Sequence, residues 1–178
     1  MIFVFSSLAE CSSCLCGGRQ TTSLESRDRA GTLNRRTASR RLFMTRIIEG
    51  GCLCGGVRYR IRGEPLISAT CQCRTCRKAS AAAIVPWIHL NSEDFAFTMG
   101  QPVAFESSPS VTRTFCGRCG TPLTYWKTSY GQAIDVTTCS LDDPEAFSPV
   151  AHVWTSHKLR WVKLADGLPC LEEGPPSD

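Results

Sequence analysis

Seven of the twelve cysteines in this 178-residue chain stand in three tight clusters, and this feature restricts the possible folds more than any other. The clusters comprise Cys52 and Cys54; Cys71, Cys73 and Cys76; and Cys116 and Cys119. Thiolates one or two residues apart can share one metal ion, whereas such short spacings suit disulfides within a cluster poorly. A closed structural zinc takes four thiolates, so seven divide into a closed site and a three-thiolate site with an open position. The sequence therefore predicts two zinc ions (Zn2+) per chain.

Two pairings of the clusters are compatible with the spacing. In the first, the Cys52–Cys54 cluster joins Cys116 and Cys119 in one tetrahedral site, and the middle cluster forms the second site. In the second, the last two cysteines of the middle cluster join Cys116 and Cys119 in a zinc ribbon, which leaves three cysteines over. The ribbon would have to accommodate the 39 intervening residues, and ribbons usually have much shorter insertions. The first pairing uses every cluster and is the one we expect.

The remaining composition argues against a secreted disulfide scaffold. The cysteines are clustered rather than spread, and residues 1–9 are apolar but lack a preceding basic residue and a suitable cleavage site. No segment approaches the roughly 20 apolar residues of a membrane-spanning helix. We therefore expect a cytoplasmic protein without a membrane partner, in a reducing compartment that keeps thiolates available for metal. Cys139 and Cys170 stand alone and are expected to be buried free thiols.

Charge divides the chain at about residue 43. Residues 1–43 carry seven arginines against three acidic residues, whereas residues 44–178 carry thirteen residues of each sign. The neutral part lacks the basic surface of a nucleic-acid-binding ribbon, so no nucleic-acid partner is expected. We expect residues 1–43 to be a disordered extension or a mis-assigned start, with an organelle-targeting segment as the alternative. Residues 44–175 form the predicted zinc-binding domain.

The domain shows strand patterns throughout. Val57, Tyr59 and Ile61 alternate with arginines, which predicts a half-buried strand whose arginine face is solvated. Further apolar runs, separated by turn residues, cover residues 81–90, 95–99, 103–106, 111–115, 122–127, 133–141 and 152–155. No segment has a long helical period. These patterns predict a mainly β fold of packed antiparallel sheets, with zinc knuckles in loops at the strand ends.

Several motifs occur in an order that is specific to one protein family. They are Gly51-Cys52-Leu53-Cys54-Gly55-Gly56, Cys71-Gln72-Cys73-Arg74-Thr75-Cys76, Phe115-Cys116-Gly117-Arg118-Cys119-Gly120, Leu141-Asp142-Asp143-Pro144 and His152-Val153-Trp154. Over about residues 48–170 the chain resembles the glutathione-dependent formaldehyde-activating enzyme family, which also contains centromere protein V. The resemblance implies a small β-tent fold with two zinc ions.

The resemblance also implies a role for each cysteine cluster. Cys52, Cys54, Cys116 and Cys119 would hold a structural zinc, and Cys71, Cys73 and Cys76 would hold a catalytic zinc. The chain departs from the family at two positions, with Gln72 where many members have histidine and Ala81 where many have glycine. Both positions border the predicted catalytic site and bear on the substrate more than on the metal.

The function expected from this site is that of a zinc-dependent carbon–sulfur lyase. A zinc-bound thiol loses its proton, and the resulting thiolate of glutathione or a similar small thiol would add to a small aldehyde such as formaldehyde. The reverse reaction would break the same carbon–sulfur bond. The alternative is a non-catalytic zinc-binding module for protein interaction, which would use the same cysteines.

Few other side chains point to catalysis. Arg74, Arg77 and Lys78 flank the middle cluster and either pair with substrate carboxylates or are simply solvated. The three histidines, His89, His152 and His157, are expected to have structural or exposed roles. Asp142 and Asp143 are typical of turn and capping positions.

Overall fold

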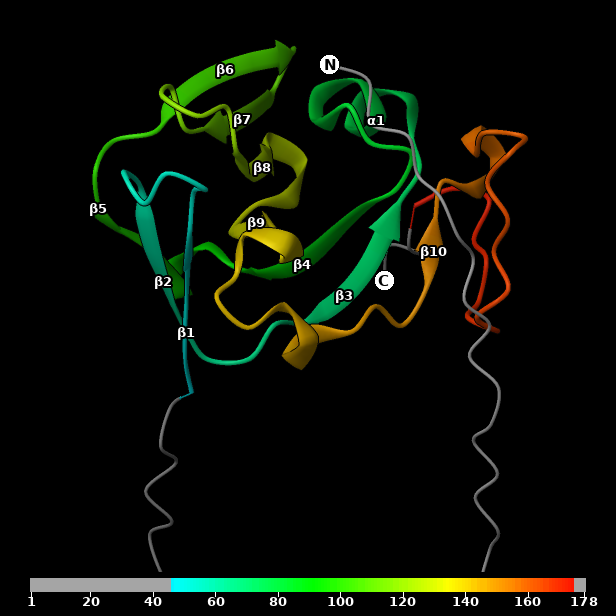
Figure 1. The fold of residues 1–178 in the computed structure, drawn as a ribbon, viewed down its shortest axis with the longest axis horizontal. Helices are drawn as coiled ribbons and strands as arrows, with labels where there is room; N and C mark the ends of the chain where they lie inside the picture. Colours follow the sequence, from blue (N-terminus) through cyan, green and yellow to red (C-terminus); the bar gives the residue numbers. More distant parts are fainter. Residues whose placement is uncertain (1–45, 175–178) are drawn as a thin grey trace, which may run out of the picture. The chain divides into compact units, whose positions relative to one another are not determined.

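Ten β-strands and one short α-helix form the part of the chain that the computed structural model describes, residues 46–174 (Figure 1). The strands are β1 (Ile47–Gly51), β2 (Arg58–Arg62), β3 (Ile67–Cys71), β4 (Val85–Asn91), β5 (Phe95–Met99), β6 (Val103–Ser108), β7 (Val111–Phe115), β8 (Pro122–Lys127), β9 (Ala133–Thr137) and β10 (His152–Val153). The helix is α1 (Arg74–Ser80). Single 3-10 turns are η1 (Ser92–Asp94), η2 (Thr128–Tyr130), η3 (Thr138–Ser140), η4 (Pro144–Phe147) and η5 (Thr155–His157). The expectations for residues 1–43 lie outside the described residues.

The strands form two sheets. The smaller sheet has the order β1-β2-β5, and the larger has the order β10-β3-β4-β9-β8-β7-β6. All neighbouring strands run antiparallel except the short pair β10 and β3. The predicted mainly β fold of antiparallel sheets is therefore confirmed.

The main hydrophobic core lies between the two sheets. Tyr59 and Ile61 of β2 are at most 1% exposed and belong to one cluster with Ile88, Leu123 and Val136 of the larger sheet, which are all 0% exposed. The alternation predicted for β2 places these apolar side chains inward. Because burial of each aliphatic side chain contributes about 1.5–3 kcal/mol, this core supplies a large part of the stability.

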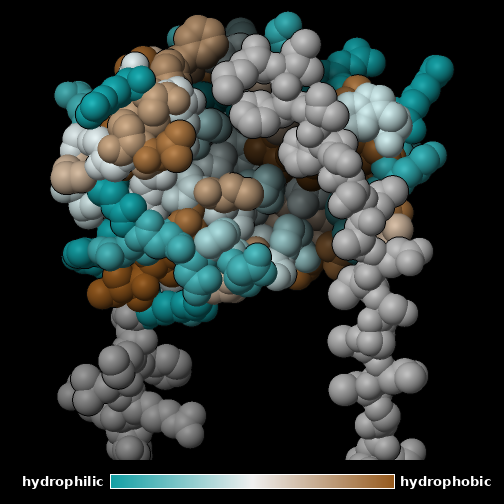
Figure 2. Space-filling model, viewed as in Figure 1, coloured by the Kyte–Doolittle hydropathy of each residue, from teal (hydrophilic) through white to brown (hydrophobic). Residues whose placement is uncertain are grey.

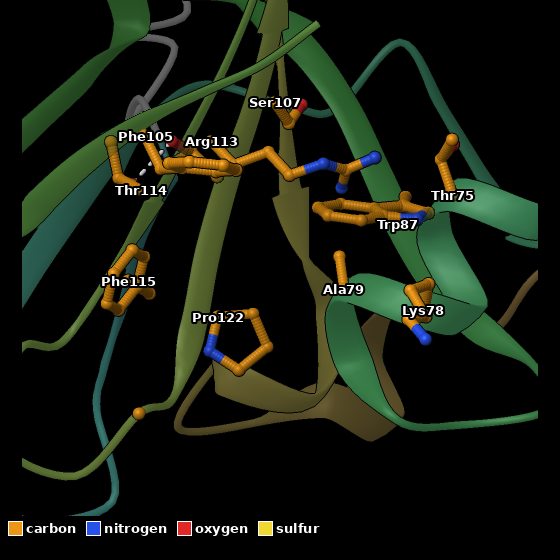
Figure 3. Close-up of a pocket in the computed structure, with 12 residues that line it drawn as sticks. Thr75, Lys78, Ala79, Trp87, Phe105, Ser107, Arg113, Thr114, Phe115 and Pro122 are labelled. Atoms are coloured by element: carbon orange, nitrogen blue, oxygen red, sulfur yellow. Dashed lines mark hydrogen bonds between the residues drawn. The ribbon is translucent and has the colours of Figure 1, made fainter.

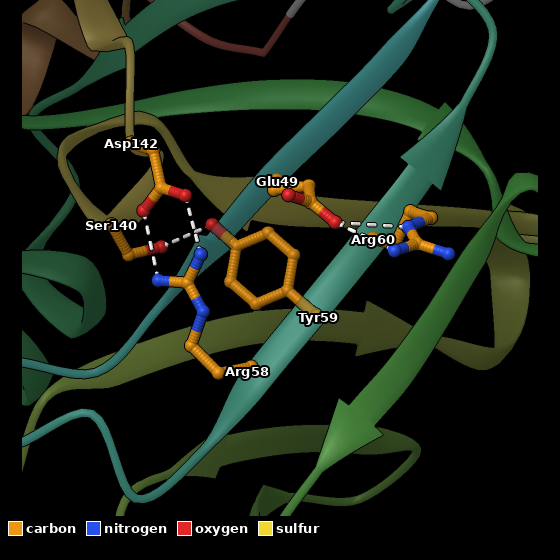
Figure 4. Close-up of polar contacts among 6 residues, drawn as sticks. All are labelled: Glu49, Arg58, Tyr59, Arg60, Ser140 and Asp142. Atoms are coloured by element: carbon orange, nitrogen blue, oxygen red, sulfur yellow. Dashed lines mark hydrogen bonds and ion pairs between the residues drawn. The ribbon is translucent and has the colours of Figure 1, made fainter.

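The arginines of β2 face away from this core, and two of them, Arg58 and Arg60, are paired with carboxylates (Figure 4). Arg58 forms a two-pronged ion pair with Asp142, and Arg60 donates to Glu49 Oε1 at 2.8 Å from Nη2 and 3.0 Å from Nε. The Arg58 guanidinium lowers the pKa of the Asp142 carboxyl. Asp142 was expected as a turn residue and here also links β2 to the segment after η3. Such exposed pairs contribute about 0–1 kcal/mol each.

Tyr59 anchors the contact between β2 and η3. Its hydroxyl lies 2.6 Å from Ser140 Oγ, and burial raises the pKa of the phenol. Gly50 on the paired strand β1 leaves room for this contact, since a Cβ there would lie 2.4 Å from Tyr59 Oη and 2.6 Å from the Ser140 carbonyl oxygen. The glycine is therefore required by a close approach between chain segments.

Helix α1 was not predicted from the sequence. It begins after Cys73, whose sulfur accepts a hydrogen bond from the Cys76 amide, and it ends at Ser80, with Ala81 as the C-terminal cap. Seven residues are too few to show a helical period, and the predicted strand over 81–90 begins only at Val85. Figure 1 shows α1 at the arrowhead end of β3.

The two lone cysteines are exposed, which corrects the expectation that they are buried. Cys139 lies in η3, where β9 has ended and the alternation of inward and outward side chains no longer applies. Cys170 lies in the irregular segment that follows η5 and forms one isolated bridge with His152. Both thiols lie outside the three clusters.

Gly50→Ala should destabilise the protein by about 1–3 kcal/mol, because the added methyl group cannot fit beside Tyr59 and Ser140. Urea unfolding measures the change. Gly174→Ala is the matched control, since a Cβ there lies 3.6 Å or more from its neighbours. Equal stability of the two variants would contradict the close approach.

Ala81→Gly should stabilise the protein by about 0.5–1 kcal/mol, because Ala81 holds the left-handed conformation with φ 50°, which favours glycine at a helix end. Thermal unfolding of the metal-loaded protein measures the gain, and a lower midpoint for the variant would contradict it.

Candidate functional site

The first and third cysteine clusters converge on one point. Cys52 and Cys54 follow β1, whereas Cys116 and Cys119 lie between β7 and β8, and all four sulfurs are within 4.8 Å of one another. The sulfurs of Cys52 and Cys54 are 3.5 Å apart, and those of Cys54 and Cys116 are 3.8 Å apart. Thiolates at 2.3 Å from a tetrahedral zinc are separated by about 3.8 Å. The four donors therefore fit a closed zinc site.

Backbone turns aim these sulfurs. The Cys52 amide donates to the Val57 carbonyl at 3.0 Å, and the Val57 amide donates to Cys52 Sγ at 3.1 Å. In the second loop, the Gly120 amide donates to the Cys116 carbonyl at 2.8 Å, and Gly120 has φ 77°. Glycine, which tolerates a positive φ, permits the tight turn at Gly120.

One cysteine of the four-cysteine group is activated by its own loop. The Thr121 hydroxyl lies 3.2 Å from Cys119 Sγ and lowers the pKa of this thiol to about 5. A thiol of low pKa is already a thiolate at neutral pH, which is the form that binds metal.

The middle cluster forms a separate group of three. Cys71 ends β3, Cys73 caps α1 and Cys76 lies within α1, with the three sulfurs within 4.8 Å of one another. The donors thus come from a strand end and a helix, rather than from a loop alone as expected. Hydrogen bonds from the Cys71 and Cys76 thiols, and from Thr75 Oγ1 at 3.2 Å, lower the pKa of Cys73. Cys73 is therefore the cysteine of this group that most readily forms a thiolate, and Cys71 and Cys76 place two further sulfur donors beside it.

The structure thus brings the cysteines together in the first of the two predicted pairings. The second and third clusters do not meet, so the ribbon pairing is wrong. The two groups also lie on different faces of the larger sheet. Cys52 and Cys116 belong to the core between the sheets with Ile88, whereas Cys71 and Cys76 pack with Trp87, the residue that precedes Ile88 in β4. Adjacent strand residues point to opposite faces.

A row of side chains that the sequence analysis missed crosses the same face as the three-cysteine group. The strand registers pair Phe105 with Arg113, Arg113 with Tyr125, Tyr125 with Asp135 and Asp135 with His89, across β6, β7, β8, β9 and β4. The row reaches the cysteines through Arg113, whose Nη2 lies 3.7 Å from Cys76 Sγ. A charged residue in the middle of each of the strands β7 and β9 was the available sequence signal.

The histidines differ in their surroundings. His152 is buried, with Nδ1 2.6 Å from Thr70 Oγ1 and Nε2 3.0 Å from the Asp166 carboxylate, and His157 stacks on Trp154. These two have the expected structural roles. His89 Nδ1 lies 2.6 Å from Asp135 Oδ1 on the face of the three-cysteine group, and burial raises the pKa of the Asp135 carboxyl.

A cavity of about 520 Å³ opens beside the three-cysteine group (Figure 3). It is lined by Thr75, Lys78, Ala79, Trp87, Phe105, Ser107, Arg113, Thr114, Phe115, Gly120, Pro122 and Thr124. Figure 3 shows the Arg113 guanidinium reaching toward Trp87 and Thr75. Thr75 also contacts Cys73, so the cavity and the thiol group share a wall.

Of the three cationic residues that flank the middle cluster, only Lys78 lines this cavity. Arg74 and Arg77 line a separate depression of about 470 Å³ with Lys78, Leu159 and the exposed Trp161.

Elsewhere on the surface, apolar side chains are interspersed with hydrophilic ones, as over β6 and β7 in Figure 2. Within residues 46–174, no helix is long and apolar enough to cross a bilayer.

The fold and the two thiol groups define a small β protein with two candidate metal sites. Residues 47–157, more than half of the chain, match the family model described as glutathione-dependent formaldehyde-activating enzyme. The chain therefore belongs to this family, and membership supports a glutathione-dependent, aldehyde-related activity.

A Rhodobacter sphaeroides protein of known crystal structure is similar, with 20% identity, a TM-score of 0.46, and coverage of 53% of this chain and 87% of that chain. No curated protein matches the sequence.

The two cysteine groups should respond differently to the loss of one sulfur. Cys116→Ser should unfold the domain, since a zinc ion held by the four-cysteine group would contribute on the order of 10 kcal/mol to folding and both sheets contact this group. Cys73→Ser should lower the zinc content from two ions to one and leave the fold intact. Elemental analysis and circular dichroism measure both effects, with Cys139→Ser, an exposed thiol outside the clusters, as the control. Unfolding of Cys73→Ser would contradict the division of roles.

Proposed function

We propose that the protein is a zinc-dependent carbon–sulfur lyase that forms or breaks the adduct of a small thiol, such as glutathione, with a small aldehyde, such as formaldehyde. The observation that carries this proposal is the three-cysteine group beside a cavity on the outer face of the larger sheet. Membership in the family of glutathione-dependent formaldehyde-activating enzymes supports the choice of substrates.

The roles of the two groups follow from their donors and their places in the fold. Cys52, Cys54, Cys116 and Cys119 would hold a structural zinc, because four thiolates close a tetrahedral site. Cys71, Cys73 and Cys76 would hold the catalytic zinc, which when bound supplies a Lewis acid with a position left for a thiol.

The reaction is balanced without a further reactant. The sulfur of the thiol forms a bond with the aldehyde carbon, the carbonyl π electrons move to oxygen, and the proton lost by the thiol ends on that oxygen. The reverse reaction breaks the carbon–sulfur bond and returns the proton to sulfur. Trp87 and Phe105 give the cavity an apolar wall against which the organic part of a small thiol can pack.

Arg113 has a defined part in this site. Its guanidinium donates toward Cys76 Sγ and lies over the Tyr125 ring, 4.7 Å from the centroid. The positive charge offsets the negative charge of the thiolates, which is costly to bury unpaired. Arg113 thereby favours the deprotonated form of the sulfur ligands.

The chemistry of the thiolates and the charge of the chain also bear on the location and the partners of the protein. Clusters of thiolates persist under reducing conditions, so we propose a cytoplasmic location. The neutral charge of residues 44–178 gives no basis for a nucleic-acid partner, and we propose none, nor a membrane partner.

The zinc-loaded protein should accelerate exchange between free glutathione and its formaldehyde adduct, measured by NMR exchange spectroscopy above the spontaneous rate. Cys73→Ser should abolish the acceleration, because it removes one of the three sulfurs, whereas Cys139→Ser should retain it. A protein with two zinc ions that gives no acceleration with any small thiol and aldehyde would overturn the proposal and favour a non-catalytic interaction module.

A further inference from the structure

Arg113 is a buried cation that forms no ion pair with any carboxylate of residues 46–174. The residue is 8% exposed, and its contacts are Cys76 Sγ, 3.7 Å from Nη2, and the Tyr125 ring. Asp135, the carboxylate of the same cross-strand row, is hydrogen-bonded to His89 instead. Because a guanidinium has five N–H donors, the Cys76 contact leaves most of its donors available. A buried arginine with free donors is suited to an anionic ligand.

The cavity beside Arg113 has the matching electrostatic character. Lys78 supplies a second cation to its lining, and no aspartate or glutamate lines it. The other walls include the aromatic side chains of Trp87 and Phe105. Figure 3 shows Lys78 and the Arg113 guanidinium on the same side of the cavity as Trp87. The cavity therefore favours a ligand with negative charge and an organic body.

The cavity is also joined to the sulfur group. Thr75 lines the cavity and lies 3.2 Å from Cys73 Sγ, and Arg113 contacts Cys76 from the cavity side. A ligand whose carboxylate meets Arg113 can therefore extend toward the three cysteines. With about 520 Å³, the cavity has the size range of sites for small organic molecules.

We propose that this cavity binds the carboxylate-bearing part of the thiol substrate, and that Arg113 and Lys78 select anionic thiols over neutral ones. Arg113 is the specificity-determining residue. Lys78 is exposed to solvent and contributes less to the selection of anionic thiols. The identity of the ligand as a thiol rests on the proposed function, whereas the affinity of the cavity for a carboxylate does not depend on turnover.

The test uses S-methylglutathione, which keeps both carboxylates and has no free thiol, with its dimethyl ester as the matched probe that lacks those charges. Titration calorimetry on the zinc-loaded full chain should show binding of the acid and binding of the ester at least 10-fold weaker. Arg113→Gln should weaken binding of the acid about 10- to 100-fold, with partial recovery in Arg113→Lys. Lys78→Gln should weaken it about 2- to 5-fold.

Arg62→Gln is the control, since Arg62 is exposed on β2 of the smaller sheet and should leave the dissociation constant unchanged. Zinc content and circular dichroism show whether Arg113→Gln is folded. If it is not, Arg113→Lys and Lys78→Gln still decide the question. Equal binding of acid and ester, or unchanged binding in all folded variants of Arg113 and Lys78, would overturn the proposal.

Failure of this inference is distinguishable from failure of the proposed function. Charge-selective binding of S-methylglutathione without acceleration of adduct exchange would overturn the lyase and support the cavity. Acceleration with equal rates for charged and neutral thiols would support the lyase and overturn the role of Arg113.

Discussion

The four-cysteine group is the constraint on which the arrangement of the two sheets depends. It joins the loop after β1, in the smaller sheet, to the loop between β7 and β8, in the larger sheet, and two of its sulfurs lie in the core between them. A bound structural zinc contributes about 10–16 kcal/mol, which is comparable to the total stability of a typical domain. The hydrophobic core packs around this four-cysteine group. The exposed ion pairs on the arginine face of β2 add little to the free energy of unfolding.

The larger sheet separates this anchor from the candidate reactive site. One face contributes Ile88 to the core, and the other face carries Trp87, the three cysteines and the row from Arg113 to His89. A metal site on the outer face can exchange a sulfur ligand without disturbing the packing between the sheets. This separation would allow two bound zinc ions to have different roles in one small domain.

The sequence was informative where chemistry depends on local spacing and uninformative where it depends on strand pairing. The grouping of Cys52 and Cys54 with Cys116 and Cys119 was predictable, because metal ligands must converge and each knuckle is a short segment. The alternation in β2 likewise predicted its buried face. Helix α1 was missed because it has seven residues, and its start depends on capping by Cys73. The cross-strand row could not be predicted, because residues separated in sequence become neighbours only through the register of five strands.

The row also changes the interpretation of the basic residues. Arg74 and Arg77 are near the three cysteines in sequence, yet they line a different depression, whereas Arg113 is distant in sequence and contacts Cys76. Three thiolates and one zinc ion would carry a net charge of −1. The thiolate of a bound substrate would make this charge −2 in a site of low polarity. A buried guanidinium at 3.7 Å from Cys76 Sγ offsets part of this charge. The same side chain lines the cavity, so Arg113 would link the charge balance of the sulfur site to the recognition of an anionic thiol, to which Lys78 also contributes.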